Sequence, residues 1–472
     1  MQILGTNIKN SSHGGILIYT AIIIFIVSLV LVSVLGNAAM QLRVLRSTIS
    51  REQAFQIAEA GVNYYQWRLA HFPNDYANGT GQSCNPCGPY VKDYLDKDTN
   101  QKIGEYSLTI TPPVVGSTVV TIQSTGYTME NTKSKRTITV RYGIPSLAKF
   151  AFLTNGDIWI GDTENVSGEM HANGGIRFDG TGNAPIKSAK QTYICQTNHG
   201  CGPTVKPGIW GAAPLATQAF WQFPMPNVDF STMTANLATL KSNAQTGGIY
   251  LPPSNAQGYS IVFGSAGTMT IYRVNSLRAH ATGYDVNGTA HNEDLDYNNR
   301  SVLSGYNNVA LPANGLIYAE DKVWVEGTLK GRVMLAAAKL PYNANTAPSI
   351  MIPNNIVYAA KDGTNSLGLL AQKHILLSYN SPNNLEINAA MIAQNGSAQN
   401  FYWENRTKGT ITVYGAVLSY GIWTWSWVNG SGTCTSGYCT TNTTYDTSLL
   451  YAPPPSFPLT TDGYQQISWT SN

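Results

Sequence analysis

The longest apolar run of the chain lies near its N-terminus, where residues 16–35 read ILIYTAIIIFIVSLVLVSVL. A helix rises about 1.5 Å per residue, so this run matches the ~30 Å hydrocarbon thickness of a bilayer. Between Lys9 and Arg43 the only acidic or basic side chain is that of His13. The run therefore predicts a helix that can span a membrane. Ala38 and Ala39 are followed by an unbroken helical pattern, which disfavours removal of the run as a secretory signal.

The apolar pattern continues past the membrane-spanning run at the three- and four-residue steps of an amphipathic helix. The positions that form this stripe are Leu42, Leu45, Ile49, Ala54, Ala58, Gly61, Tyr65 and Leu69. No proline occurs before Pro73, so one helix is predicted over residues 16–72.

Three features of this region together resemble a known family. They are a short polar leader ending in Gly14 and Gly15, the apolar helix that follows directly, and the stretch AFQIAEAG at residues 54–61, which holds Glu59, Ala60 and Gly61. This combination is similar to the N-terminal domain of PilX-type minor type IV pilins and type II secretion pseudopilins.

The resemblance implies that residues 1–15 are a prepilin leader, which a prepilin peptidase cuts after Gly15. Ile16 would then be the new, usually N-methylated, terminus, and the helix would pack among other pilins in a filament core. Many major pilins carry a glutamate five residues after the cut, where this chain has Thr20. That departure suits a low-copy or tip subunit. The alternative is an uncleaved single-pass anchor in the cytoplasmic membrane.

Beyond residue 104 the apolar and polar positions alternate, which is typical of strands with one buried face. The alternating segments are residues 106–110, 119–122 and 137–140, separated by proline, glycine and polar residues. Three or four antiparallel strands after a long helix also resemble a pilin head, so residues 73–145 are predicted to form that domain.

The remaining chain, residues 146–472, consists of short apolar strands divided by glycine, asparagine and aspartate. Five apolar markers, Val333, Ile356, Ile375, Met391 and Ile411, follow one another at intervals of 23, 19, 16 and 20 residues. A period near 20 favours a β-solenoid, and a β-sandwich is the alternative. The regularity is lost over residues 185–309, which we expect to be an excursion that contains a helix at residues 230–243.

The six cysteines form three local pairs, Cys84 with Cys87, Cys195 with Cys201, and Cys434 with Cys439. In an exported chain this pattern predicts three small disulfide-closed loops. A redox or zinc motif at Cys84 and Cys87 is the alternative, but a second C-x-x-C is absent from the sequence.

Composition agrees with export. Only 12% of the residues are charged, about half of the ~25% usual for soluble globular domains. The net charge is +3 without a dense Lys/Arg run, so nucleic acid is not an expected partner. The predicted location is the cytoplasmic membrane, through the single N-terminal helix, with the bulk of the chain at the cell surface or on a pilus.

Acidic residues are the candidates for catalysis and metal binding, because polysaccharide hydrolysis uses two facing carboxylates. The residues near one another in sequence are Asp157, Asp162, Glu164, Glu169 and Asp179, with His171 beside them. Their spacing carries no catalytic signature, and turn or surface roles are expected. Glu293, Asp294 and Asp296 form a second cluster that is a weak candidate for Ca²⁺, without the spacing of an EF-hand loop. No other cofactor is expected.

Three tryptophans, Trp423, Trp425 and Trp427, alternate along one predicted strand. Their rings are candidate contacts for a surface glycan or a partner protein, or they belong to the core. Together these features predict a non-enzymatic minor pilin-like protein that anchors or caps a type IV pilus or related filament and displays a β-solenoid for adhesion. A membrane-tethered β-solenoid polysaccharide lyase or hydrolase is the alternative.

Overall fold

The computed structural model describes residues 13–230, 237–292, 295–429 and 432–472 of the chain. The chain divides into two compact units. Unit 1 comprises Met1–Pro112, Thr121–Arg141 and Gln466–Asn472, and unit 2 comprises Pro113–Val120 and Tyr142–Gln465. Each unit therefore contains segments that are far apart in the sequence.

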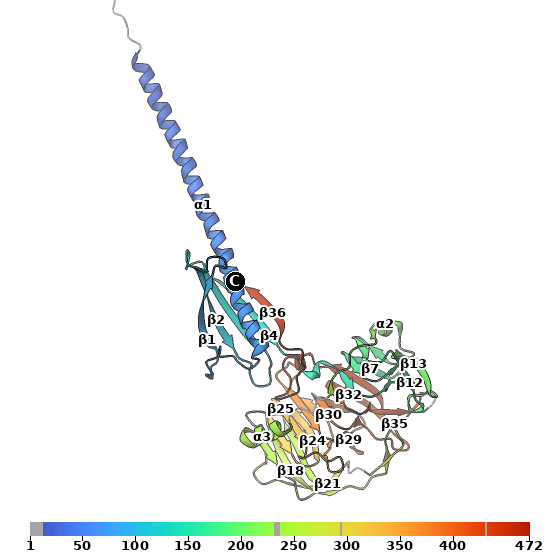
Figure 1. Ribbon diagram of the computed structural model, residues 1–472. Coiled ribbons are helices and arrows are strands. Elements are labelled where there is room, and N and C mark those ends of the chain that lie inside the picture. Colours follow the sequence, from blue (N-terminus) through green and yellow to red (C-terminus); the bar gives the residue numbers. More distant parts are fainter. Residues whose placement is uncertain (1–12, 231–236, 293–294, 430–431) are drawn as a thin grey trace, which may run out of the picture. The chain divides into compact units, whose positions relative to one another are not determined.

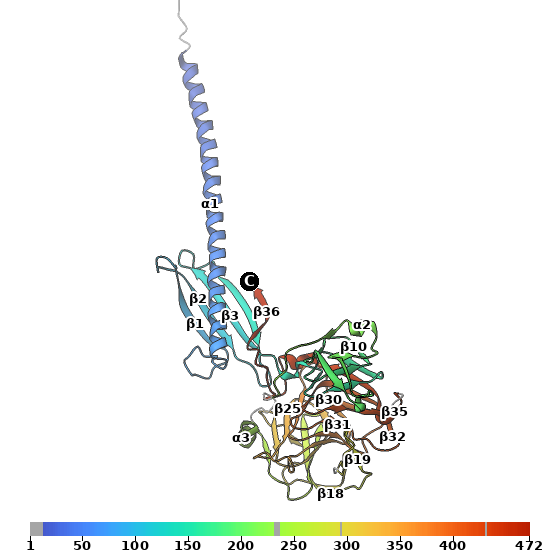
Figure 2. The same ribbon diagram turned by 45° about the vertical axis from the view of Figure 1, so that its right-hand side comes forward.

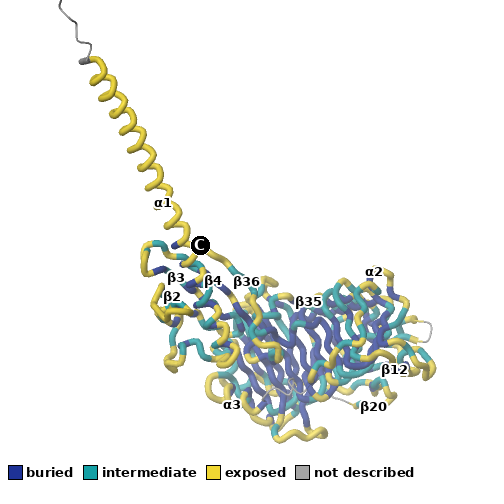
Figure 3. The backbone as a smooth tube through the Cα atoms, turned by 45° about the horizontal axis from the view of Figure 1, so that its top comes forward, coloured by how far each residue is buried: buried dark blue, intermediate teal, exposed yellow. Residues whose placement is uncertain are grey.

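Unit 1 begins with one long helix, α1 (His13–His71), as the apolar periodicity predicts (Figure 1). Its apolar half has a mean hydropathy of 2.9, and the helix is long enough to cross a membrane. Figure 3 shows that this half is exposed, whereas burial begins near Ser50. The two halves of α1 thus have different surroundings within unit 1.

The second half of α1 packs on a five-stranded sheet (Figure 2). The strands, in their order across the sheet, are β1 (Cys87–Leu95), β2 (Lys102–Thr111), β3 (Val120–Thr128), β4 (Arg136–Gly143) and β36 (Gln465–Ser471). β1 pairs antiparallel with β2, and β2 pairs antiparallel with β3. The alternating segments predicted from the sequence correspond to β2, β3 and β4, and β1 is an additional strand.

The strand β36 comes from the far end of the chain and adds to the edge formed by β4 (Figure 2). Thr137 and Asn472 exchange backbone hydrogen bonds of 2.9 and 3.3 Å between N–H and carbonyl groups. The sequence-based prediction assigns all of residues 146–472 to the second domain, whereas β36 pairs with the sheet of unit 1. The difference arises because strand pairing is a long-range contact that the local pattern of a seven-residue strand does not reveal.

Glycines allow α1 to lie close to the sheet. A Cβ atom at Gly126 would lie 2.4 Å from the carbonyl oxygen of Ala54, and one at Gly61 would lie 2.8 Å from the Tyr106 ring. The predicted stripe residues Ala54, Ala58, Gly61, Tyr65 and Leu69 are all buried. The helix stripe is therefore the core face of unit 1.

Unit 2 is built mainly from parallel strand pairs that form long ladders. The first ladder contains, in spatial order, β16 (Ile249–Leu251), β23 (Leu316–Ala319), β25 (Arg332–Ala337), β28 (Ser366–Ala371), β30 (Leu385–Ala393), β32 (Arg406–Ser419), β5 (Phe152–Thr154), β8 (Met170–Ala172), β11 (Ile186–Ser188) and β15 (Trp221–Gln222). The second ladder contains β17 (Gly258–Gly264), β24 (Val323–Leu329), β26 (Ile350–Ile352), β29 (Ile375–Leu377), β31 (Ala398–Gln399) and β33 (Trp423–Thr424).

A third ladder of parallel pairs runs through β24, β27 (Ile356–Tyr358), β30, β32, β35 (Cys434–Tyr445), β7 (Glu164–Ser167) and β10 (Thr181–Gly182). A short parallel sheet contains β6 (Ile158–Ile160), β9 (Ile176–Phe178) and β14 (Ile209–Trp210). Antiparallel pairs join β12 (Thr192–Cys195) to β13 (Thr204–Pro207), β17 to β18 (Thr268–Leu277), β18 to β21 (Tyr297–Val302) and to β22 (Val309–Ala310), β19 (Gly283–Tyr284) to β20 (Ala290–His291), and β34 (Ser426–Val428) to β35.

The residues that pair in register within the first ladder are not evenly spaced in the sequence. Leu335, Leu369, Met391 and Val417 follow one another as partners, at steps of 34 (335 to 369), 22 (369 to 391) and 26 (391 to 417) residues. The five sequence markers do not pair with one another in the described ladders; Val333 pairs with Leu367, for example. The period near 20 therefore mixes positions from different ladders.

The segment predicted as an excursion, residues 185–309, contributes several strands to these ladders. Ile186 pairs with Met170, Ile249 with Ile317, and Tyr259 with Val323, all in parallel. The helix expected at residues 230–243 is α3 (Leu237–Gly247), and residues 231–236 lie outside the described part. Helix α2 (Leu215–Gln218) is a single turn.

The order of the first ladder in space differs from the order in the sequence. β5, the first strand of unit 2 in the chain, lies between β32 and β8. Apolar partners stack on one another along the ladder, so Val417, Phe152 and Met170 belong to one core cluster. A second cluster covers the other face, where Leu237 and Leu240 of α3 contribute. Figure 3 shows the ladder strands as buried.

Candidate functional site

The residues around the predicted leader cut lie within α1. Gly15 and Ile16 are helical, and Ile16 is 65% exposed. The Thr20 hydroxyl donates to the backbone carbonyls of Ile16 and Leu17 at 3.0 Å. The Thr20 hydroxyl group therefore has its hydrogen-bond partners inside its own helix. Gly14 also lies in α1, and the remaining leader residues, 1–12, are outside the described part.

The second half of the predicted filament motif lies against the sheet. Glu59 and Ala60 are half-buried, and Gly61 is buried where α1 meets Tyr106. The motif thus packs against the sheet within unit 1.

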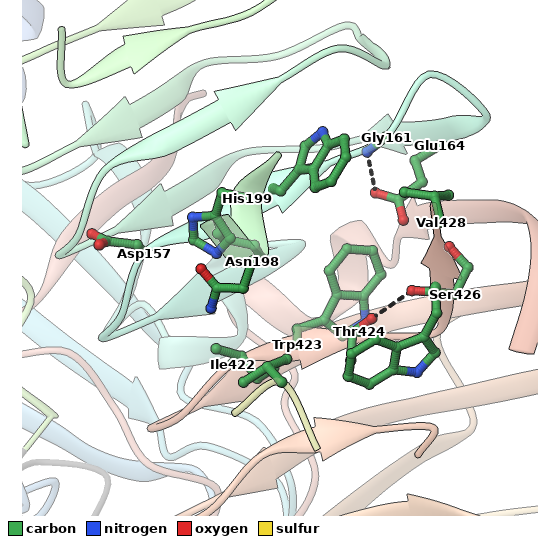
Figure 4. A pocket seen from close by; sticks show the side chains of 14 residues that line it. Asp157, Gly161, Glu164, Asn198, His199, Ile422, Trp423, Thr424, Ser426 and Val428 are labelled. Carbon is green, nitrogen blue, oxygen red and sulfur yellow. Dashed lines mark hydrogen bonds between the residues drawn. The ribbon is translucent and has the colours of Figure 1, made fainter. Parts of the chain in front are cut away.

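In unit 2, two of the three predicted tryptophans line one pocket (Figure 4). Its lining residues are Asp157, Ile158, Trp159, Gly161, Glu164, Asn198, His199, Val286, Ile422, Trp423, Thr424, Ser426, Trp427 and Val428. Trp423 is 4% exposed, and Trp425, which is fully buried, packs edge-on against it at 6.0 Å between ring centroids. Trp425 and Trp423 thus both belong to the core of unit 2, Trp423 with an edge at the pocket, while the half-buried Trp427 is available to a ligand.

Hydrogen bonds fix the rings of this pocket. The Trp427 indole N–H donates to the carbonyl of Asn400 at 2.8 Å. The Trp159 indole N–H donates to Asp179 at 2.8 Å, and the Arg177 guanidinium covers one face of the Trp159 ring at 4.1 Å. The aromatic walls are therefore held in place before any ligand arrives.

Glu164 lies at the start of β7 and is 5% exposed. Its Oε2 accepts a hydrogen bond from the Gly161 backbone N–H at 3.1 Å (Figure 4). The pKa of Glu164 is raised to about 8, mainly by burial and to a smaller extent by the nearby Asp162, while the Gly161 bond opposes the rise. The carboxyl group is therefore mainly protonated at neutral pH.

The other candidate acids do not face Glu164 as a catalytic pair would. Asp157 also lines the pocket, but its Oδ1 accepts from the Gly175 N–H at 2.7 Å, and Figure 4 shows it turned away from Glu164. Asp179 holds Arg177 and Trp159, and Glu169 pairs with Lys187 at 2.7 Å.

His171 lies apart from the pocket lining. It is buried, and its Nε2 lies 3.1 Å from the Asn173 side-chain oxygen. Burial lowers the pKa of His171, which favours the neutral imidazole.

The three predicted cysteine pairs are all disulfide-bonded. Two of these loops belong to the pocket region. Cys195 and Cys201 enclose Asn198 and His199, which line the pocket. Cys434 and Cys439 lie on β35, which pairs with the pocket strand β34. The Cys84–Cys87 loop lies in unit 1, at the start of β1.

The weak Ca²⁺ candidate is only partly described. Asp296 is 6% exposed, and its carboxylate accepts from the backbone and side-chain N–H groups of Asn380 at 3.2–3.4 Å. Glu293 and Asp294 lie outside the described residues. Among the residues that the structure describes, no group of three or more His, Cys, Asp or Glu side chains is placed to hold a metal ion. The Ca²⁺ site stays a prediction.

Sequence reasoning missed Trp159, Asn198 and His199 as pocket residues. They come from β6 and the Cys195–Cys201 loop, more than 220 residues before Trp423 in the chain. Long-range strand pairs, β32 with β5 and β35 with β7, bring these segments together, and local pattern does not encode such contacts.

Comparison with known proteins identifies the N-terminal region. Residues 13–63 match the family model described as PilX N-terminal. The search of curated proteins finds no match. The crystal structure of the competence-associated pilin ComZ from Thermus thermophilus matches with 12% identity and a TM-score of 0.31, covering 90% of this chain and 97% of that chain. At so low a TM-score we build nothing on this second likeness. The N-terminal region of this chain is pilin-like.

Proposed function

We propose that the protein is a minor pilin-like subunit of a type IV pilus or related filament, which displays unit 2 for adhesion. The observation that carries the proposal is the family match over residues 13–63, which coincides with the apolar helix α1. In this proposal the leader ends at Gly15, and Ile16 is the mature terminus. Prepilin peptidase and other pilins are the partners.

The exposed half of α1 supports this role. Leu42, Leu45 and Ile49 are 56%, 55% and 48% exposed, although they continue the apolar stripe that is buried farther along the helix. Apolar surface of this extent requires cover by lipid or by neighbouring subunits. In the proposal the cytoplasmic membrane provides it before assembly and other pilin helices provide it afterwards.

The uncharged Thr20 supports a low-copy position. Because its hydroxyl bonds within its own helix, it leaves no carboxylate to pair with the terminal amine of a neighbour. A subunit of this kind suits an end of the filament, where one set of neighbours is missing.

For unit 2 we propose a β-solenoid, in which each coil places one strand in each ladder. The in-register parallel partners support this, as does the single apolar cluster that runs through all three ladders. We propose that unit 2 binds rather than catalyses, since the described carboxylates Asp157, Glu169 and Asp179 each have a structural partner.

Recovery of the chain in filaments sheared from native cells tests this function. We expect the wild-type chain in the sheared fraction, and we expect it to be missing when prepilin peptidase is deleted. Gly15→Val, beside the cut, should also be retained in the membrane. Gly36→Val is the matched control in the same helix, because a Cβ atom there meets nothing within 4 Å. Recovery that is independent of the peptidase, or equal for both variants, would overturn the proposal.

A further inference from the structure

The pocket of unit 2 lined by Trp159, Trp423 and Trp427 combines features that ordinary packing does not explain. Glu164 is only 5% exposed, and its Oε2 accepts from the Gly161 backbone N–H. Its Oε1 has no hydrogen-bond partner among the described residues and is not one of the fully buried unpartnered atoms, so this oxygen is accessible from the pocket. Since this carboxyl group lines a pocket, a ligand can supply the missing bond.

The polar groups around the pocket indicate the chemistry of that ligand. Asn198, Thr424 and Ser426 offer neutral amide and hydroxyl groups beside the aromatic rings. None of the lining residues is a lysine or an arginine, so the pocket is poorly suited to phosphate or another anion. Burial keeps the carboxyl group of Glu164 mainly protonated, and a protonated carboxyl both donates and accepts.

We propose that this pocket binds one edge of a sugar ring of a neutral saccharide, with C–H groups of the ring against Trp427 and Glu164 bonded to a hydroxyl group. This rests on the proposed adhesive function and names its ligand class. Apolar ring faces flanked by a few fixed polar groups are the arrangement that such a ligand requires.

The size of the pocket limits how much of the glycan it holds. Its volume is about 100 Å³. That is smaller than the ~150 Å³ cavity that encloses benzene. The pocket is half-open, so one edge of a sugar ring enters while the rest of the glycan stays in solvent. A terminal or branching residue of a surface glycan fits this description.

Both disulfide loops beside the pocket support its shape. Cys195–Cys201 closes the loop that presents Asn198, and Cys434–Cys439 braces the strand that pairs with Trp427. Loops this short restrict little chain entropy, so we assign them to positioning of the pocket rim.

Ligand-observed NMR with a panel of methyl pyranosides tests the inference on the full chain. The protein is kept in a polyoxyethylene detergent, because a maltoside headgroup is itself a saccharide. At least one glycoside should show saturation transfer. Trp427→Ala should weaken its affinity by about tenfold or more. Tyr342→Ala, at an exposed aromatic residue outside the pocket, is the matched control and should leave affinity unchanged.

Glu164→Gln separates the saccharide from a cationic ligand such as tetramethylammonium. Glutamine keeps a neutral donor and acceptor, so this variant should bind the glycoside within about threefold of the wild type at neutral pH. Wild-type affinity should change near pH 8, where the carboxyl group turns from a donor and acceptor into an acceptor only, and the variant should show no such change. The comparison isolates Glu164 from the other titratable groups of the pocket region, which are Asp157 and His199 in the lining and Asp162 close to Glu164.

Binding of tetramethylammonium that rises with pH and disappears in Glu164→Gln would overturn the inference, and so would glycoside binding that Trp427→Ala leaves unchanged. The filament assay distinguishes the two proposals. If no glycoside binds but the chain is recovered in filaments, the saccharide inference fails alone. If a glycoside binds but the chain is missing from filaments, the filament function fails alone.

Discussion

At the scale of single residues, Glu164 and Arg332 are charged side chains whose surroundings come from distant parts of the chain. Glu164 is the first residue of β7, and it pairs with Thr441 of β35, which lies far away in the sequence. Arg332 is half-buried, and its guanidinium donates to the backbone carbonyls of Gly116, Gly363, Ala452 and Pro453. Both residues depend on segments that only the folded unit 2 brings together.

Glu164 makes the stability of unit 2 depend on pH. Its pKa is about 8 in the folded chain against 4.5 as the ordinary value, so the folded state holds a proton that the unfolded state releases between these values. The contribution of Glu164 to stability is therefore fully present below about pH 4.5 and is lost as the pH rises to about 8, by about 5 kcal/mol at most. Asp285 and Asp362, whose pKa values are lowered by their hydrogen bonds against the opposing effect of burial, act in the opposite sense at acidic pH. Thermal unfolding of the full chain in detergent should show this fall, and Glu164→Gln should reduce it. Glu169→Gln, at a half-exposed ion pair, should behave like the wild type.

Arg332 joins the segment Pro113–Val120 and the tail near Pro453 to the first ladder of unit 2. The compact ammonium group of lysine cannot donate to all four carbonyls that the planar Arg332 guanidinium contacts. Arg332→Lys should therefore destabilise unit 2 by about 2–4 kcal/mol. Denaturant unfolding measures this. Arg273→Lys, at an exposed arginine, is the control and should cost less than about 0.5 kcal/mol. Equal stability of the two variants would show that the carbonyl contacts are dispensable.

At the scale of elements, local periodicity predicts what a segment becomes but not what it pairs with. The stripe from Ala54 to Leu69 identifies the buried face of α1, because a helix repeats its contacts every three or four residues. The alternation in β2, β3 and β4 is equally local. Pairing of β36 with the unit 1 sheet, and the place of β5 between β32 and β8, are long-range contacts, and the sequence pattern does not contain them.

The contact between α1 and its sheet depends on Gly61. A Cβ atom there would lie 2.3 Å from Ser124 Oγ and 2.8 Å from the buried Tyr106 ring. Gly61→Ala should destabilise unit 1 by about 1–3 kcal/mol, even though alanine favours helices. Hydrogen exchange in β2 and β3 would report the loss as faster exchange. Gly36→Ala, in an open part of the same helix, should leave exchange unchanged; faster exchange in both variants would contradict the packing explanation.

The pocket illustrates the same limit at a functional site. Sequence reasoning singled out Trp423 and Trp427 because aromatic residues at alternate positions are conspicuous. It assigned Glu164 to a turn, because nothing in its neighbours along the chain indicates burial. The residues Trp159, Asn198 and His199 enter the site through long-range ladder contacts, of β32 with β5 and of β35 with β7.

At the scale of the whole molecule, the chain combines a pilin-like region with a much larger unit inserted into it. Unit 1 is completed by Gln466–Asn472 after the chain has formed unit 2. The chain therefore passes between the units four times, after Pro112, Val120, Arg141 and Gln465. In the proposed filament, α1 provides assembly and unit 2 provides the binding surface.

The mass of the N-terminal peptide, from chain purified out of native membranes or sheared filaments, tests the central claim most directly. We predict a terminus at Ile16, with the mass of a methylated amine, because the apolar helix and the family match over residues 13–63 make the N-terminal region pilin-like. An intact Met1 in the mature protein would contradict the claim, since a helix that keeps its polar leader serves as a single-pass anchor and does not enter a filament core.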